Sequence, residues 1–199
     1  MLYLLRHTKP DIQPNICYGW TDLDLDPLFK TEHLPAVLSK FENSRKQNLI
    51  TEGKKLEFQK IYSSPLQRCR ILATEVAIAV GYQKEIIESD LLKEINFGDW
   101  EMKSWDEIYS YPQGKRWFDN YMNERTPNGE SFMDLEERLR RFLAEIGDES
   151  KNNDVLVVTH AGAIRAIMLI LGRIKRTEIF ETKLAYGELC QDIPQQYLP

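Results

Sequence analysis

Apolar residues recur along this chain of 199 residues in two patterns, short continuous runs and longer runs with helical spacing. The short runs predict strands at residues 2–5, 60–63, 85–88 and 154–159. The last of them, DVLVVT, is nearly continuous and rich in valine, which is typical of a strand buried on both faces of a sheet.

Helical spacing follows two of these strands directly. Ser64 and Pro65 supply a cap and a first-turn proline for a helix that continues to Gly81. A second, apolar helix is expected at residues 163–171, after the last strand. A third is expected from Ser131, where an acidic residue three positions on completes a capping box. Alternation of strands and helices implies an α/β fold with a mostly parallel central sheet.

Two tracts between these elements are less regular. Residues 30–57 are polar and charged, and we expect a helix and a loop there. Residues 96–130 are rich in aromatic side chains, prolines and glycines, which predicts a helical excursion from the sheet that serves as a lid. Neither a repeat nor a linker is visible, so residues 1–199 are expected to form one domain that carries this lid.

Composition narrows the choice of partners. The net charge of -5 argues against nucleic acid, because a phosphate backbone favours a basic face. The cysteines, Cys17, Cys69 and Cys190, form no C-x-x-C pair, so neither a disulfide framework nor a zinc ribbon is expected. The apolar run 163–171 contains Arg165 and is too short to cross a bilayer. We therefore expect a cytoplasmic protein without a membrane partner, and the sequence leaves a homodimer open.

Two histidines occupy matching positions at the ends of predicted strands. His7 ends the first strand, and His160 ends DVLVVT just before the helix that follows. In open α/β sheets, ligands bind outside the carboxyl ends of the strands, near helix N-termini that favour anions. If the two strands are neighbours, both imidazoles face one crevice. The third histidine, His33, lies in a charged tract and is interpreted as a surface residue.

Charged residues near these histidines suggest a phosphoryl group as the ligand. Arg68 falls in the first turn of a predicted helix, where a cation is unfavourable unless it meets a bound anion. A surface salt bridge is the alternative, and Arg70 competes for the same role. Arg6 and Arg68 could clamp a phosphoryl group, which leaves the imidazoles for chemistry. Glu94, expected to be half-buried, could protonate the alkoxide that is expelled.

These motifs occur in the order found in the histidine phosphatase superfamily, the phosphoglycerate-mutase-like enzymes, and the resemblance spans residues 1–190. It implies a three-layer α/β/α fold and a phosphomonoesterase that uses no metal or cofactor. His7 would be the phosphorylated nucleophile and Glu94 the general acid and then base. The phosphate pocket would consist of Arg6, Arg68 and His160.

Flanking residues resemble the alpha-ribazole phosphatases of cobalamin biosynthesis more closely. The resemblance is carried by RHTKP, CYGWTDLDL, YSSPLQRCRILA, FGDWEMKSWDEI, PNGESF and VTHAGAIRAI. It implies alpha-ribazole 5'-phosphate as the small-molecule substrate, with Tyr18, Gly19 and Trp20 at the substrate rim. The chain departs from the family pattern at Thr8 and Ala161, where glycine is usual.

Other functions fit the sequence less well. A calcium loop at residues 22–33 is excluded, because Pro27 takes the required glycine position and His33 the glutamate position. A general sugar-phosphate phosphatase and a phosphoglycerate-mutase-like enzyme remain as alternatives with the same chemistry. A non-catalytic phosphate-binding module is disfavoured, because binding alone needs no acid such as Glu94.

Overall fold

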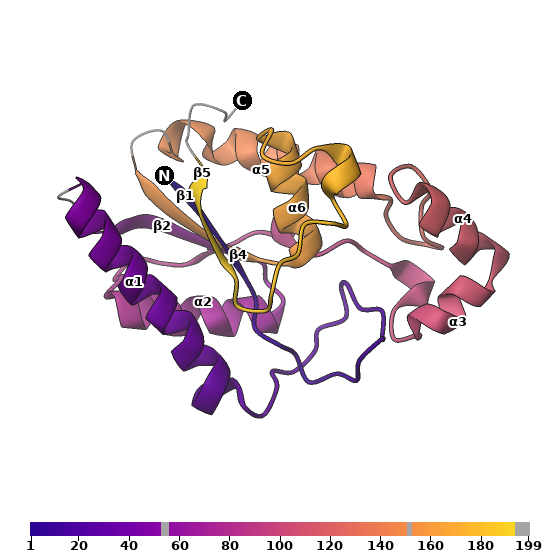
Figure 1. Ribbon diagram of the computed structural model, residues 1–199, viewed down its shortest axis with the longest axis horizontal. Helices are drawn as coiled ribbons and strands as arrows, with labels where there is room; N and C mark the ends of the chain where they lie inside the picture. Colours follow the sequence, from indigo (N-terminus) through magenta and orange to yellow (C-terminus); the bar gives the residue numbers. More distant parts are fainter. Residues whose placement is uncertain (53–55, 151–152, 194–199) are drawn as a thin grey trace.

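The protein is built on one mixed sheet of five strands, in the order β3-β2-β4-β1-β5. The computed structural model describes residues 1–52, 56–150 and 153–193 (Figure 1). The strands are β1 (Leu2–Arg6), β2 (Phe58–Ser63), β3 (Ile87–Glu88), β4 (Asp154–Thr159) and β5 (Leu189–Ile193). All neighbouring pairs are parallel except β1 and β5, so the prediction of a mostly parallel sheet is confirmed.

Two strand predictions need correction. The strand expected at residues 85–88 has only two residues, because its pairing with β2 is confined to Tyr62 and Ser63. Strand β5 was not predicted. Its sequence, LCQDI, lacks a clear alternation, and it is held at the sheet edge by antiparallel pairing with β1.

Helices cover both faces of the sheet and give three layers (Figure 1). Along β1, Leu2 and Leu4 belong to the core that contains the apolar sides of α5 (Phe132–Ser150) and α6 (Ala161–Ile170). Tyr3 and Leu5 point the other way, into the core formed with α1 (Leu34–Glu52) and α2 (Gln67–Val80). This alternation follows from the two-residue repeat of a strand, and it explains why β1 is apolar on both faces.

The helix boundaries differ slightly from the predicted ones. Helix α2 begins at Gln67, after an extended Leu66, so Ser64 and Pro65 precede the helix instead of starting it. Helix α6 begins at Ala161, directly after β4. The capping box of α5 is confirmed by reciprocal hydrogen bonds between Ser131 and Asp134. The short helices are η1 (Phe29–His33), η2 (Asp90–Leu92), η3 (Gly98–Trp100) and η4 (Arg176–Glu178).

The aromatic tract 96–130 contains η3 and two short α-helices, α3 (Trp105–Ser110) and α4 (Pro112–Asn120), which lie at one end of the molecule (Figure 1). Its rings pack on one another: Trp105 stacks on Trp117 with centroids 5.9 Å apart, and Phe97 meets Trp105 edge-on at 5.2 Å. Edge-on and offset contacts are the favourable geometries for aromatic pairs. The tract therefore has a small aromatic core, continuous with that of α5.

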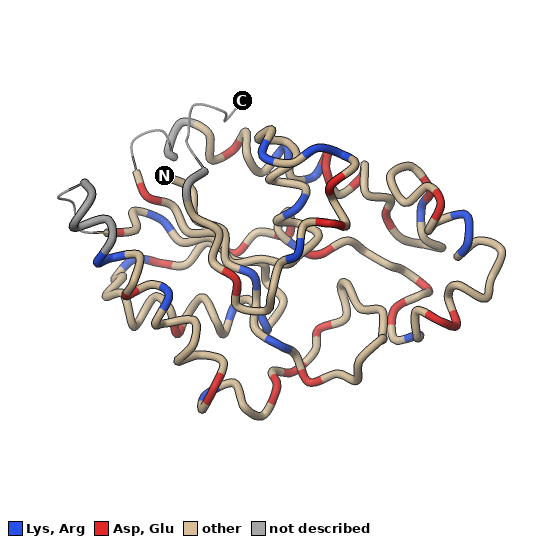
Figure 2. The backbone as a smooth tube through the Cα atoms, in the orientation of Figure 1, with Lys and Arg blue, Asp and Glu red and all other residues tan. Residues whose placement is uncertain are grey.

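Charged residues of both signs are interspersed along the helices and loops (Figure 2). Within the described ranges, no helix is long and apolar enough to cross a membrane.

Candidate active site

The two strand-end histidines meet in the structure. The parallel register of β1 and β4 pairs Arg6 with Thr159, so His7 and His160 follow at neighbouring positions. Their ring centroids are 5.0 Å apart, and both side chains are buried. The two imidazoles therefore lie side by side at the carboxyl ends of these strands, as expected from the sequence.

Hydrogen bonding selects one tautomer of His7. Its Nδ1 lies 2.7 Å from the carbonyl oxygen of Thr8. Because a carbonyl can only accept, Nδ1 carries the proton. Burial holds the pKa of His7 well below its usual value, and the positive charges of Arg68 and Arg6 lower it further. His7 is therefore neutral at physiological pH, with the lone pair of Nε2 available as a nucleophile.

Arg68 is fully buried beside the histidines. Its Nη2 donates to the carbonyl of Gly19 at 2.6 Å and its Nη1 to that of Thr21 at 2.8 Å. These bonds fix the guanidinium and tie the loop 18–21 to α2. Arg70, the competing residue, is half-exposed and lies 3.9 Å from Glu88 at the surface, so the structure brings only Arg68 to the histidines.

Arg6 is held by residues near the C-terminal end of the described chain. Its Nη1 donates to the carbonyl of Leu184 at 2.5 Å, and its guanidinium lies 3.9 Å above the ring of Tyr186. In the described part of the chain, Nε of Arg6, Nε of Arg68 and Oγ1 of Thr8 are buried without a hydrogen-bond partner. Buried donors are normally satisfied, so these three leave unused capacity that an oxyanion would fill.

A serine and a cysteine support His160. Nε2 of His160 lies 2.9 Å from Oγ of Ser64 and 3.5 Å from Sγ of Cys69. Burial lowers the pKa of His160 well below its usual value, and Arg68 adds to this effect. Sequence reasoning assigned Ser64 only to a helix cap. The contact between Ser64 and His160 is visible only in the folded structure, because the two residues are 96 positions apart in the sequence.

Glu94 is half-buried, as expected, and is anchored at the start of α6. Its Oε2 accepts from the backbone N–H of Gly162 and its Oε1 from that of Ile95, both at 3.0 Å. A Cβ added to Gly162 would stand 2.2 Å from Oε1 of Glu94. Only glycine leaves room for this close approach. The carboxylate is thereby held two residues beyond His160.

Arg138 holds the segment that carries Glu94. Its guanidinium donates to the carbonyls of residues 91, 93 and 94 at 2.7, 2.9 and 3.1 Å. It also pairs with Glu130 at 2.9 Å. Trp20 donates from Nε1 to the same Glu94 carbonyl at 2.7 Å. Sequence reasoning missed Arg138, since it lies on the amphipathic helix α5 with no local sign of a role at the site.

The expected rim residues form a tightly held loop. The carboxylate of Glu101 accepts from the backbone N–H groups of Trp20 and Thr21 at 2.7 and 2.5 Å. A Cβ on Gly19 would stand 2.0 Å from a backbone oxygen, so the loop needs glycine there. The Tyr18 hydroxyl lies 2.7 Å from that of Tyr186, a residue that sequence reasoning did not single out.

An apolar pocket of about 200 Å³ opens beside Glu94. Glu94, Gly162 and Arg165 line one side of it. Aromatic rings form much of the remainder, from Phe97, Trp105, Trp117, Tyr121, Phe132 and Phe180. The rings of Phe97, Trp105, Trp117 and Tyr121 come from the aromatic tract. Phe132 lies at the start of α5 and Phe180 follows η4, and neither was named as a site residue from the sequence.

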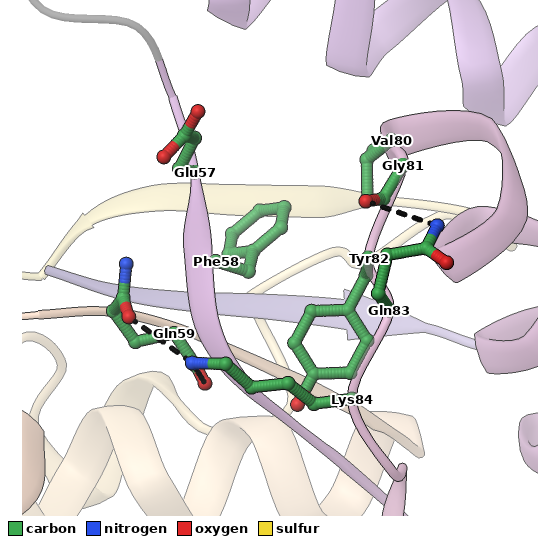
Figure 3. A pocket seen from close by; sticks show the side chains of 8 residues that line it. All are labelled: Glu57, Phe58, Gln59, Val80, Gly81, Tyr82, Gln83 and Lys84. Atoms are coloured by element: carbon green, nitrogen blue, oxygen red, sulfur yellow. Dashed lines mark hydrogen bonds between the residues drawn. The ribbon is translucent and has the colours of Figure 1, made fainter.

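A wider hollow, about 420 Å³, lies at the opposite end of β2 from Ser63 (Figure 3). Lys84 crosses it and donates to the backbone and side-chain oxygens of Gln59, each at 3.2 Å. The residues drawn there include no histidine or arginine, whereas those side chains gather at the other end of the sheet. Over residues 1–52, 56–150 and 153–193, no three His, Cys, Asp or Glu side chains are grouped to hold a metal ion.

Residues 2–191 match the model of the histidine phosphatase superfamily (branch 1), and the chain belongs to this family. Phosphoserine phosphatase 1 of Hydrogenobacter thermophilus is 30% identical over 175 residues, which cover 85% of this chain and 75% of the relative. The adenosylcobalamin/alpha-ribazole phosphatase of Escherichia coli is 27% identical over 169 residues, covering 84% and 76%.

The fold is likewise similar to that of the alpha-ribazole phosphatase from Shigella flexneri. The TM-score is 0.74 at 20% identity, over 94% of this chain and 87% of that one. The predicted three-layer, phosphoglycerate-mutase-like fold is thus confirmed, and the protein is a phosphoric monoester hydrolase.

Proposed function

We propose that the protein hydrolyses its substrate through a phosphohistidine at His7. In the first step, Nε2 of His7 attacks phosphorus, the phosphorus–oxygen ester bond breaks, and protonated Glu94 gives its proton to the leaving oxygen. In the second step, water attacks phosphorus, the nitrogen–phosphorus bond breaks, and Glu94 takes the proton of the water. Inorganic phosphate and the free alcohol are the products.

The observation that carries this proposal is the neutral, Nδ1-protonated His7 beside three buried donors without partners. Arg6, Arg68 and His160 would bind the phosphoryl oxygens, whose charge is spread over the group during transfer. Trapping with labelled substrate and denaturing quench tests the intermediate. The label is expected to be acid-labile and stable in base, and an acid-stable label would overturn the assignment.

No step in this mechanism requires a metal ion, because Arg6 and Arg68 supply the positive charge. Activity is therefore expected to survive exhaustive chelation with EDTA. Loss of activity that a divalent cation restores would contradict this part of the proposal.

For the substrate we propose alpha-ribazole 5'-phosphate, with the enzyme acting in the cytoplasm. The support is twofold: the aromatic pocket adjoins the proposed acid Glu94, and two of the similar proteins bear the name alpha-ribazole phosphatase. A flat, apolar heterocycle suits walls of aromatic rings. A panel of phosphate esters tests this choice, and a higher kcat/KM for phosphoserine or 3-phosphoglycerate would reject it without affecting the phosphohistidine chemistry.

A further inference from the structure

Arg165 is the positively charged side chain that lines the aromatic pocket. It lies on α6, one turn beyond Ala161, and its Nε donates to the carbonyl of Thr182 at 3.0 Å. That bond fixes the plane of the guanidinium. Among the described residues, Nη1 and Nη2 of Arg165 have no recorded hydrogen bond or ion pair, so two sets of donors remain for a ligand.

Arg165 lines the same pocket as the proposed acid, Glu94. Burial lowers the pKa of Arg165, the carboxylate of Glu94 raises it, and the charge of Arg6 lowers it. Arg165 remains a cation at neutral pH. A phosphate ester bound at His7 with its leaving oxygen at Glu94 would therefore present the next atoms of its alcohol to Arg165.

We propose that Arg165 is a specificity-determining residue that donates hydrogen bonds to the sugar oxygens near the ester, while the aromatic pocket binds a flat apolar group beyond them. This inference rests on the proposed phosphatase function. A guanidinium only donates, so it selects oxygen acceptors, and the rings beyond it select apolar surface. Polar contacts nearest the ester and apolar ones farther out match a sugar phosphate that carries a heterocycle.

A short alcohol that bears a carboxylate, such as serine, is the competing ligand, since a carboxylate would also pair with Arg165. It would leave most of the ring-lined pocket of about 200 Å³ uncovered. Burial of apolar surface is the main source of affinity in pockets of this kind. The size and lining of the pocket therefore favour the larger, sugar-linked heterocycle.

The test measures kcat/KM of Arg165→Met and Arg165→Lys on four esters: alpha-ribazole 5'-phosphate, ribose 5-phosphate, benzyl phosphate and phosphoserine. A hydrogen bond to a charged group corresponds to about a tenfold to hundredfold effect. The kcat/KM of Arg165→Met is expected to fall by about tenfold to hundredfold on the two sugar esters, mainly through a higher KM. On benzyl phosphate the fall in kcat/KM is expected to be at least fivefold smaller. Arg165→Lys should recover part of the loss, because it keeps the charge without the fork.

Arg70→Met is the matched control, an exposed arginine outside the site whose loss should leave all four rates unchanged. Equal losses of Arg165→Met on all four esters, or no loss, would overturn the inference. A loss confined to phosphoserine would also overturn it, in favour of carboxylate recognition. The unfolding temperature of each variant shows whether a loss of activity comes from lower stability, because the Arg165 variants also lack the hydrogen bond to Thr182. If the wild-type protein hydrolyses none of the esters, the proposed function itself fails.

Discussion

The two halves of the site are held together by different forces. The phosphate half lies at the ends of parallel strands, and its side chains are fixed by hydrogen bonds to backbone carbonyls, as with Arg68 on the loop 18–21. The leaving-group half is formed by packed rings from the aromatic tract, α5 and Phe180. Hydrogen bonds have strict geometry, whereas ring packing tolerates exchange of one apolar side chain for another.

This difference separates chemistry from specificity within one fold. A phosphoryl group has the same shape in every ester, so a rigid set of donors at the strand ends serves any substrate. The alcohol varies, and the part of the site that we propose to meet it consists of segments that do not belong to the sheet. Substitutions in the phosphate half are expected to affect all esters alike, and those in the leaving-group half to affect them unequally.

The largest effect is expected at the nucleophile. His7→Ala removes the attacking Nε2 and should reduce turnover of every ester to the background rate. Folding is expected to persist, since the strand β1 that precedes His7 is buried by apolar residues. Rates with alkyl and aryl esters, together with far-ultraviolet circular dichroism, provide the measurement. Substantial turnover by a folded His7→Ala protein would disprove the assignment.

The next effect concerns the acid. Glu94→Gln is expected to lower kcat by about 10²–10⁴-fold on alkyl esters, the usual range for general acid–base catalysis. The loss should be smaller on p-nitrophenyl phosphate, whose leaving group needs little protonation. Equal losses on both would indicate a positioning role, or an acid elsewhere, such as Asp99 or Glu101.

Gly162→Ala probes the same acid without replacing it. The added Cβ would collide with Oε1 of Glu94, so the carboxylate has to move. The variant is therefore expected to show the same dependence on the leaving group as Glu94→Gln, with a smaller loss. Ala161→Gly serves as the neighbouring control, because it adds no atom near Glu94. A loss that is equal for all leaving groups would show that Glu94 has kept its place.

The proximity of the residues in the proposed phosphate half could be predicted from the sequence, because they follow strands whose pattern is local. Arg6, His7 and His160 come directly after apolar runs, and parallel pairing brings those strand ends together. The contacts that hold the remainder are distant in sequence. The bond from Arg6 to Leu184 spans 178 positions, and that from Arg138 to Leu91 spans 47. No periodicity encodes such pairs.

The leaving-group half was predicted only as an aromatic tract. Its rings were visible in the sequence, but Phe180 and Arg165 join them only because α6 and the segment after it fold back over the tract. The departure at Thr8 was also visible, whereas its buried Oγ1 without a partner was not. An aromatic-rich stretch indicates a small core, and the fold decides which of its faces borders a ligand.

A further prediction uses acid to weaken the phosphate half. His7 and His160 have pKa values well below the usual 6.5 in the folded chain, so the unfolded chain binds protons that the folded one does not. Their contribution to stability is complete above pH 6.5 and declines as the pH falls below it. Each group can lower the unfolding free energy by at most about 1.4 kcal/mol per pH unit, and the two together by about 2 kcal/mol between pH 6.5 and 5.5, because an unfolded histidine is only half protonated at pH 6.5.

Denaturant unfolding across this range provides the measurement, and the double variant His7→Gln, His160→Gln is the comparison. The double variant should show a shallower dependence of unfolding free energy on pH. If it follows the wild-type slope, the buried histidines take up protons in the folded state and the electrostatic description of the phosphate half is wrong.

The smallest effect is expected in the leaving-group half, at Phe180. Its ring packs against Tyr121 with centroids 4.2 Å apart, yet 58% of the residue is exposed, so it can contact a substrate without supporting much of the core. Stacking of a base on an aromatic ring contributes on the order of 1–3 kcal/mol. For one ring among several, Phe180→Ala should lower the kcat/KM ratio of alpha-ribazole 5'-phosphate to ribose 5-phosphate by about tenfold, the lower end of that range.

Two variants make this ratio informative. Phe118→Ala removes a ring of the same cluster that does not line the pocket, as far as the described residues show, and should leave the ratio unchanged. Trp20→Phe removes the hydrogen bond to the Glu94 carbonyl, which supports the acid for every ester, so both rates should fall together. If the ratio instead falls in Trp20→Phe and stays constant in Phe180→Ala, the heterocycle stacks at the rim 18–20, and the ring-lined pocket is not where specificity arises.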